Sequence, residues 1–148
     1  MLISLAALGL AAAQPAAAGT LGEIRMHLFY QETGRLSPDI SPPASFAGFN
    51  IGIGEGDAEE RADDLMVVVE IRSNGEQFIE TPLRVVARGG EGNGVLGERR
   101  WESVGTGENG RAYLPLYLRG VGCAGNVSVT ATFGRATRTE TLTLDCGE

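Results

Sequence analysis

The stretch that most constrains the fold is residues 110–146, where two alternating runs are joined by a glycine turn and bracketed by two cysteines. Successive side chains of a β-strand point to opposite faces. Residues 127–133 alternate apolar side chains with serine and threonine, and residues 137–144 carry threonine at every second position. Between them, Gly134-Arg135 suits a two-residue type II′ turn, which needs positive φ at its first central position. The stretch therefore predicts an antiparallel hairpin.

The register of that hairpin brings the two cysteines together. A two-residue turn sets Phe133 opposite Ala136, and the same register sets Cys123 opposite Cys146. We therefore predict a disulfide at the open end of the hairpin. One alternative is a four-residue loop over residues 134–137, which shifts the register by two, keeps the faces and offsets the cysteines. Two buried free thiols are the other alternative, and a metal site would need a second pair of ligands nearby.

The segment before the hairpin predicts an edge strand with an exposed binding surface. Residues 111–119 alternate alanine and leucine with larger polar side chains, and Pro115 cannot donate to a sheet ladder. Tyrosine and arginine are enriched among the residues that dominate protein interfaces. The alternative is ordinary covering of the sandwich rim. The candidate binding residues are Arg111, Tyr113, Tyr117 and Arg119.

Short strands account for the rest of the fold. Gly, Asn and Pro separate further apolar or alternating runs, and the mature chain has no helical period. Seven or eight short strands at this spacing predict an all-β antiparallel β-sandwich. The expected strands, besides the three above, cover residues 23–30, 46–53, 65–72, 81–88 and 99–104.

The first 18 residues predict a signal peptide. Leu2–Ala13 is a short uncharged apolar run, and Ala16-Ala17-Ala18 fits the small-residue cleavage rule. Residues 19–148 then form a single sandwich domain. No basic residue precedes the apolar run, so an uncleaved anchor is the alternative to cleavage. The run is short for a transmembrane helix, and we expect no membrane span after processing. Export and a disulfide together favour the periplasm, secretion or the cell surface.

The net charge of −7 argues against nucleic-acid binding, because phosphate contacts need clustered cations. All 12 basic residues are arginine, which with the abundant Ala and Gly is typical of a bacterial protein from a GC-rich genome. We expect a monomer whose partner is a protein or another envelope component.

Three segments of the second half carry a family resemblance. They are Pro82-Leu83-Arg84-Val85-Val86-Ala87, Glu108-Asn109-Gly110-Arg111-Ala112 and Asn126-Val127-Ser128-Val129-Thr130-Ala131. In this order they resemble bacterial immunoglobulin-like domains of invasin-like surface proteins. The resemblance covers about half of the mature chain. It implies adhesion, display or binding, and it brings no catalytic residues.

The acidic loop over residues 54–64 is a candidate calcium site, because calcium takes six to eight oxygen ligands and sandwich loops often supply them. The spacing does not match an EF-hand, and the alternative is a solvated charged loop that keeps a sheet edge soluble. No other cofactor is expected. The candidate ligands are Asp57, Glu59, Asp63 and Asp64.

Catalysis is poorly supported by the sequence. His27 is the single histidine, no G-x-S-x-G nucleophile elbow is present, and the cysteines are expected to bond to each other. We therefore expect a non-enzymatic binding or adhesion module of the bacterial envelope that acts through the edge-strand surface. The alternatives are a structural or assembly accessory of an envelope complex and a calcium-stabilised sandwich, and a small hydrolase with paired carboxylates is the least favoured.

Overall fold

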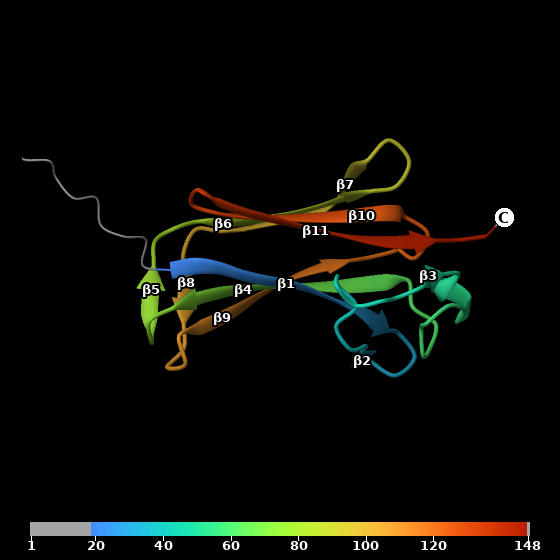
Figure 1. Ribbon diagram of the computed structural model, residues 1–148, viewed down its shortest axis with the longest axis horizontal. Helices are drawn as coiled ribbons and strands as arrows, with labels where there is room; N and C mark the ends of the chain where they lie inside the picture. Colours follow the sequence, from blue (N-terminus) through green and yellow to red (C-terminus); the bar gives the residue numbers. More distant parts are fainter. Residues whose placement is uncertain (1–18, 148) are drawn as a thin grey trace, which may run out of the picture.

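The computed structural model describes residues 19–147, and the proposed signal peptide lies outside this range. Two sheets pack face to face as the layers of a sandwich (Figure 1). The first sheet has the order β2-β1-β4-β9, and the second has the order β3-β11-β10-β6-β7. The described chain contains no α-helix, and no helix in residues 19–147 is long and apolar enough to cross a membrane. The all-β sandwich is therefore confirmed.

The strands follow the sequence order of their labels. The first sheet contains β1 (Gly19–Tyr30), β2 (Arg35–Leu36), β4 (Asp64–Ser73) and β9 (Arg111–Leu118). The second contains β3 (Gly48–Phe49), β6 (Leu83–Gly89), β7 (Gly94–Trp101), β10 (Gly125–Phe133) and β11 (Ala136–Asp145). A two-stranded ribbon joins β5 (Gln77–Ile79) to β8 (Val104–Thr106), and the 3-10 turn η1 spans Ile51–Ile53.

The core lies between the two sheets and follows the alternation of the sequence. In β4 the inward side chains are fully buried, while their neighbours face outward. Burying one such Val or Leu side chain contributes about 1.5–3 kcal/mol, so each strand is held in its register by its apolar face. The inward residues of β4 are Leu65, Val67, Val69 and Ile71.

The closing hairpin has the expected register. Phe133 pairs with Ala136, and Gly134 has the positive φ of 59° that the turn requires. Cys123 and Cys146 form a disulfide with 5.1 Å between their Cα atoms. The disulfide prediction is confirmed, and the bond is compatible with an extracytoplasmic location.

Three expectations about strands are wrong in part. Over residues 46–53 the strand covers Gly48–Phe49, which pairs parallel to β11, and η1 replaces the remainder because Asn50 adopts a left-handed φ of 49°. The strand expected over residues 99–104 is β7, which begins earlier, at Gly94, and ends at Trp101, and Val104 belongs to the separate strand β8. Residues 77–79 form β5, which the sequence reading had not assigned to a strand.

Candidate functional site

The outer face of the first sheet holds both candidate tyrosines. β9 is the last strand of its sheet, as Pro115 indicated, and it pairs with β4, which pairs in turn with β1. The register aligns outward residues of all three strands: Tyr117 lies opposite Met66, which lies opposite His27. We call this surface the tyrosine–arginine face. It consists of Arg25, His27 and Phe29 from β1, Met66, Val68, Glu70 and Arg72 from β4, and Arg111, Tyr113, Pro115 and Tyr117 from β9.

Tyr117 is 39% exposed, yet its ring and hydroxyl are both held. The hydroxyl donates to Asp64 Oδ2 at 2.5 Å, and the Phe29 ring meets the Tyr117 ring edge to face at 5.6 Å between centroids. Asp64 Oδ1 accepts from the Gly120 N–H at 2.9 Å. The hydrogen bond to Asp64 raises the pKa of Tyr117 to about 12. Burial opposes ionisation of Asp64, but the bonds from Tyr117 and Gly120 and the charge of the exposed Arg119 lower its pKa.

Tyr113, 46% exposed, is covered on one side by a guanidinium. The Arg25 Cζ lies 5.7 Å from the Tyr113 ring centroid, a cation–π distance. Arg25 is in turn held by Glu23, with 3.1 Å between Nη2 and Oε2. Both tyrosines therefore present apolar area in a fixed orientation, which lowers the entropic cost of ordering these side chains in a contact.

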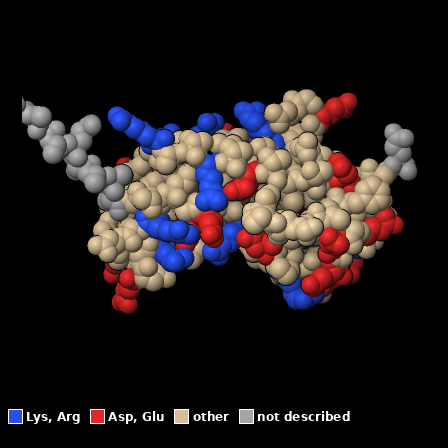
Figure 2. Space-filling model, viewed as in Figure 1, with Lys and Arg blue, Asp and Glu red and all other residues tan. Residues whose placement is uncertain are grey.

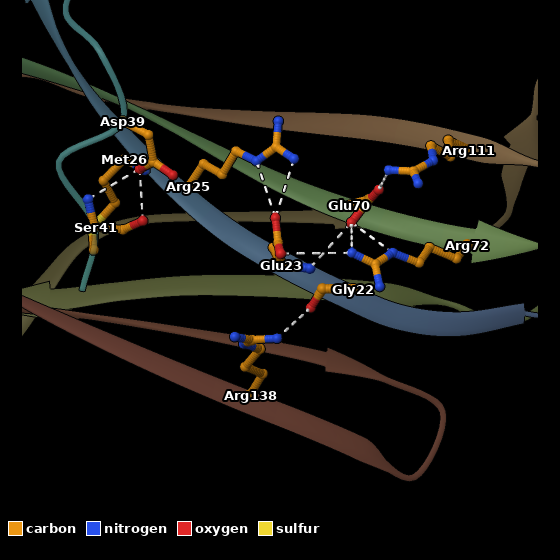
Figure 3. Close-up of polar contacts among 10 residues, drawn as sticks. All are labelled: Gly22, Glu23, Arg25, Met26, Asp39, Ser41, Glu70, Arg72, Arg111 and Arg138. Atoms are coloured by element: carbon orange, nitrogen blue, oxygen red, sulfur yellow. Dashed lines mark hydrogen bonds and ion pairs between the residues drawn. The ribbon is translucent and has the colours of Figure 1, made fainter. Parts of the chain in front are cut away.

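Glu70 anchors the arginine end of this face, as Figure 3 shows. Its side chain is 1% exposed, and its two oxygens each lie 2.6 Å from a guanidinium nitrogen, one from Arg72 and one from Arg111. Burial disfavours the charged form, but the hydrogen bond from Arg72 and the charges of both arginines lower the pKa of Glu70. Glu70 is therefore a buried carboxylate beneath two half-exposed cations.

A bulge in β1 makes room for that carboxylate. The β1–β4 register shifts between Leu21 and Ile24, which leaves Gly22 and Glu23 outside the regular pairing. A Cβ at Gly22 would lie 2.6 Å from Glu70 Oε2, and the Glu23 N–H points to the same oxygen at 3.5 Å. The absence of a side chain at Gly22 is thus what allows Glu70 to lie beneath the sheet surface.

The open side of β9 is protected against strand addition. Pro115 has no N–H, and its carbonyl oxygen accepts from Arg99 Nη1 of β7 at 3.2 Å. Arg99 also lies over the Trp101 ring, with its Cζ 4.6 Å from the centroid. A partner strand would find neither a donor nor a free acceptor at the middle of β9. The middle of β9 therefore offers side chains, and not main-chain groups, to its surroundings.

Three of the four candidate calcium ligands, Asp57, Glu59 and Asp64, have carboxylates that bond to separate protein partners. Asp57 accepts from the Ala47 N–H at 2.8 Å, and Glu59 pairs with Arg35 at 3.6 Å. Asp64 is the acceptor for Tyr117 and Gly120, whereas the main-chain oxygen of Asp63 accepts from the Val121 N–H at 2.7 Å. Within residues 19–147, no group of three or more His, Cys, Asp or Glu side chains is arranged to hold a metal ion.

The acidic side chains are concentrated in one part of the molecule. Residues 31–64 carry eight acidic side chains and two arginines, a net charge of −6 out of the −7 of the whole chain. Figure 2 shows most of the acidic side chains on the visible side at the end that carries β2 and β3, with arginines towards the middle and the opposite end. The arginine end of the tyrosine–arginine face lies outside residues 31–64, whereas Tyr117 at the other end borders the acidic region through its bond to Asp64.

The outer face of the second sheet provides a contrast. On β10 and β11 its side chains are small and polar and bond to each other: Thr130 and Thr139 hydroxyls are 2.9 Å apart, and Thr143 donates to Asn126 at 2.8 Å. On the neighbouring β6 and β7 the same face carries charged side chains, among them the Arg84–Glu98 pair. Of the exposed large aromatic side chains in the described chain, Tyr113 and Tyr117 lie on the first sheet's outer face, Phe49 lies on β3 and Phe78 on β5. The polar rows are Asn126, Ser128, Thr130 and Thr132 on β10, and Thr137, Thr139, Thr141 and Thr143 on β11.

Several members of the face were missed by the sequence reading. Arg25, Phe29 and Arg72 belong to strands whose pairing partners the sequence does not specify. Glu70 did leave a signal, because it is the one charged residue in the apolar run 65–71. A charge in a central strand predicts a paired, buried group. Of the four expected binding residues, the structure brings Tyr113, Tyr117 and Arg111 onto one face, and Arg119 lies one residue beyond β9.

No protein-family model matches the chain, and no curated protein sequence is significantly similar to it. The class that the fold and the site define is a disulfide-bonded β-sandwich with one tyrosine–arginine face.

Proposed function

We propose that this protein is an exported, non-enzymatic binding module of the bacterial envelope that engages a macromolecular partner through the tyrosine–arginine face. The observation that carries the proposal is the state of Tyr113 and Tyr117. Both are more than a third exposed, and both are held in place by Arg25, Phe29 and Asp64. Exposed aromatic side chains that are fixed in advance are what protein interfaces use as anchors.

The flat shape of the face favours a macromolecule over a small ligand. Tyr113 and Tyr117 are four residues apart on one strand, a span of about 13 Å at about 3.3 Å per residue. Between them Pro115 and, on the next strand, Val68 and Met66 add apolar area. A small molecule needs a concave site that covers most of its surface, whereas a flat apolar area with a polar rim suits a protein-sized partner.

The proposed location rests on two features. The disulfide Cys123–Cys146 is stable in oxidising compartments. Residues 1–18 have the sequence pattern of a signal peptide. Together they support an extracytoplasmic location, in which envelope proteins and secreted partners would be accessible to the face.

Affinity capture from a native envelope extract tests the proposal. The exported chain is the bait, beside Tyr113→Ala and a Tyr113→Ala/Tyr117→Ala double variant. Thr130→Ala/Thr139→Ala, on the opposite outer face, is the matched control. Thermal unfolding of each variant verifies that it is folded.

We expect a partner that is retained by the threonine variant, weakened by the single tyrosine variant and lost with the double variant. A partner retained by both tyrosine variants would move the binding site elsewhere. Stable incorporation into a large complex that ignores the tyrosines would favour the structural accessory. Failure to capture any partner would contradict the binding role.

A further inference from the structure

We propose that the arginine end of the tyrosine–arginine face receives a carboxylate from an acidic protein segment, which also places an apolar or aromatic side chain on the tyrosines. This inference rests on the proposed function and specifies the chemistry of the partner. The free hydrogen-bond donors, the charge and the apolar surroundings of Arg25, Arg72 and Arg111 support it.

The three guanidinium groups have donors left over. A guanidinium has five N–H donors. Arg25 directs Nε and Nη2 to Glu23, and Arg111 directs Nη1 to Glu70. Arg72 directs Nε and Nη2 to Glu70, and its Nη2 also lies 3.8 Å from Glu23 Oε1. Their side chains are 36%, 45% and 44% exposed, so the remaining donors are accessible from solvent. Planar donor pairs of this kind match a carboxylate.

The charge of the cluster is complementary to a single anion. Three arginines surround two carboxylates, which gives the five residues a net charge of +1 in a protein of net charge −7. Glu70 is buried beneath the arginines, so the accessible layer is more positive than the count implies. One added carboxylate would neutralise the cluster and would be attracted to it over roughly one Debye length.

The surroundings favour a protein over an acidic polysaccharide. Next to the arginines lie the half-buried side chains of Met66 and Val68, the Pro115 ring and the two tyrosines. Sugar hydroxyl groups set against this strip would lose hydrogen bonds to water without replacement. A Leu, Phe or Tyr side chain would gain from burial there, at about 25 cal/mol per Å². A carboxylate beside such a side chain is the combination that the face fits.

Three defined polymers test the inference by fluorescence anisotropy against the exported chain. A Glu–Tyr copolymer offers carboxylates and aromatic rings, poly-glutamate offers carboxylates alone, and polygalacturonate offers carboxylates on a sugar chain. Arg25→Gln is the test variant, because Arg25 pairs with the exposed Glu23 and not with buried Glu70. Arg100→Gln is the matched control, since Arg100 makes the same two-nitrogen pair with Glu102 two residues away.

We expect the Glu–Tyr copolymer to bind more tightly than poly-glutamate, and polygalacturonate to bind most weakly. Arg25→Gln should weaken copolymer binding about tenfold, as loss of a charge-assisted hydrogen bond would, and Arg100→Gln should leave it within about twofold. Raising the NaCl concentration from about 0.05 M to about 0.5 M should weaken binding by the wild-type chain more than by Arg25→Gln.

Equal losses in both arginine variants, or no binding of either polypeptide, would overturn the inference. Preference for polygalacturonate would assign the face to an acidic polysaccharide instead. An envelope partner that is captured through the tyrosines but ignores Arg25→Gln would overturn the carboxylate assignment and leave the proposed function standing. Loss of both results would remove both proposals.

Discussion

The buried carboxylate of Glu70 leads to an asymmetric prediction. Glu70 is 1% exposed, whereas Arg72 and Arg111 are nearly half exposed. Removing the arginines strands a charge in the sheet, but removing the charge lets two cations return to water. The Arg72→Met/Arg111→Met variant should therefore be less stable than Glu70→Gln, although each change breaks the same ion pairs.

The magnitudes follow from what remains at the site. In the double variant the Glu70 carboxylate keeps the Glu23 N–H at 3.5 Å, so the loss should approach about 3–4 kcal/mol. Glu70→Gln preserves shape and neutral hydrogen bonds and should cost about 1–2 kcal/mol. In a domain of this size about 3 kcal/mol lowers Tm by roughly 10 °C.

Unfolding in guanidinium chloride at neutral and at acidic pH measures the free energy of unfolding of each variant. The lowered pKa of Glu70 determines the sign of the pH effect. The pKa of Glu70 is lowered in the folded wild-type chain, so its ion pairs stabilise above the unfolded pKa near 4.5 and are lost as pH falls through the folded value. Without the arginines, burial dominates and favours the protonated form. The gap between wild type and the double variant should therefore shrink on acidification. A gap that is independent of pH, or a larger loss in Glu70→Gln, would refute this reasoning.

Four further predictions concern stability and titration. Gly22→Ala should lower the free energy of unfolding by about 2 kcal/mol, because its Cβ would meet the Glu70 carboxylate at 2.6 Å. Gly105→Ala, which has open space around it, should lower it by less than about 0.5 kcal/mol, and equal losses would contradict the role of the bulge. The tyrosinate absorbance of Tyr117, identified by its loss in Tyr117→Phe, should have its midpoint near pH 12, and Asp64→Asn should lower that midpoint. Because the folded pKa is raised from 10.0, the stabilisation of the fold by the Tyr117–Asp64 bond is complete below about pH 10 and is lost as pH rises through about 12. Replacing both cysteines by serine should cost about 3 kcal/mol in chemical denaturation, and an unchanged stability would show that the hairpin needs no covalent closure. Calcium in excess of EDTA should leave Tm unchanged, since the carboxylates of Asp57, Glu59 and Asp64 bond to separate partners and no described group of three or more acidic side chains is arranged to hold a metal ion; a rise in Tm would restore the calcium hypothesis.

The parts of the fold that the sequence predicted are those with local causes. A glycine turn and strict alternation define the closing hairpin, so its register and its disulfide follow from residues close together in the chain. Pro115 likewise identified an edge strand without any knowledge of its neighbours. At Asn50 the left-handed backbone ends the short strand and starts η1, although the alternation of apolar side chains predicted that the strand would continue to residue 53.

The candidate site was only half predictable, because most of it depends on pairing between distant strands. Tyr113 and Tyr117 could be placed on one face from the period of β9 alone. The contacts that fix them come from Arg25 on β1 and Asp64 on β4, and no local pattern aligns those strands with β9. A single charge in an apolar run marked Glu70, but its partners became visible only with the sheet order.

The order of the second sheet also determines when the chain can fold. β10 separates β6 from β11, so the centre of this sheet is made by the last two described strands. Until residues 125–145 have been synthesised, β6 with Leu83 and Val85 lacks β10 as its neighbouring strand. The first sheet then has no complete second sheet to pack against. A chain that is still being synthesised therefore exposes its future core to proteases and chaperones. We therefore expect folding to be completed only once β10 and β11 are present, and removal of these two strands to prevent it.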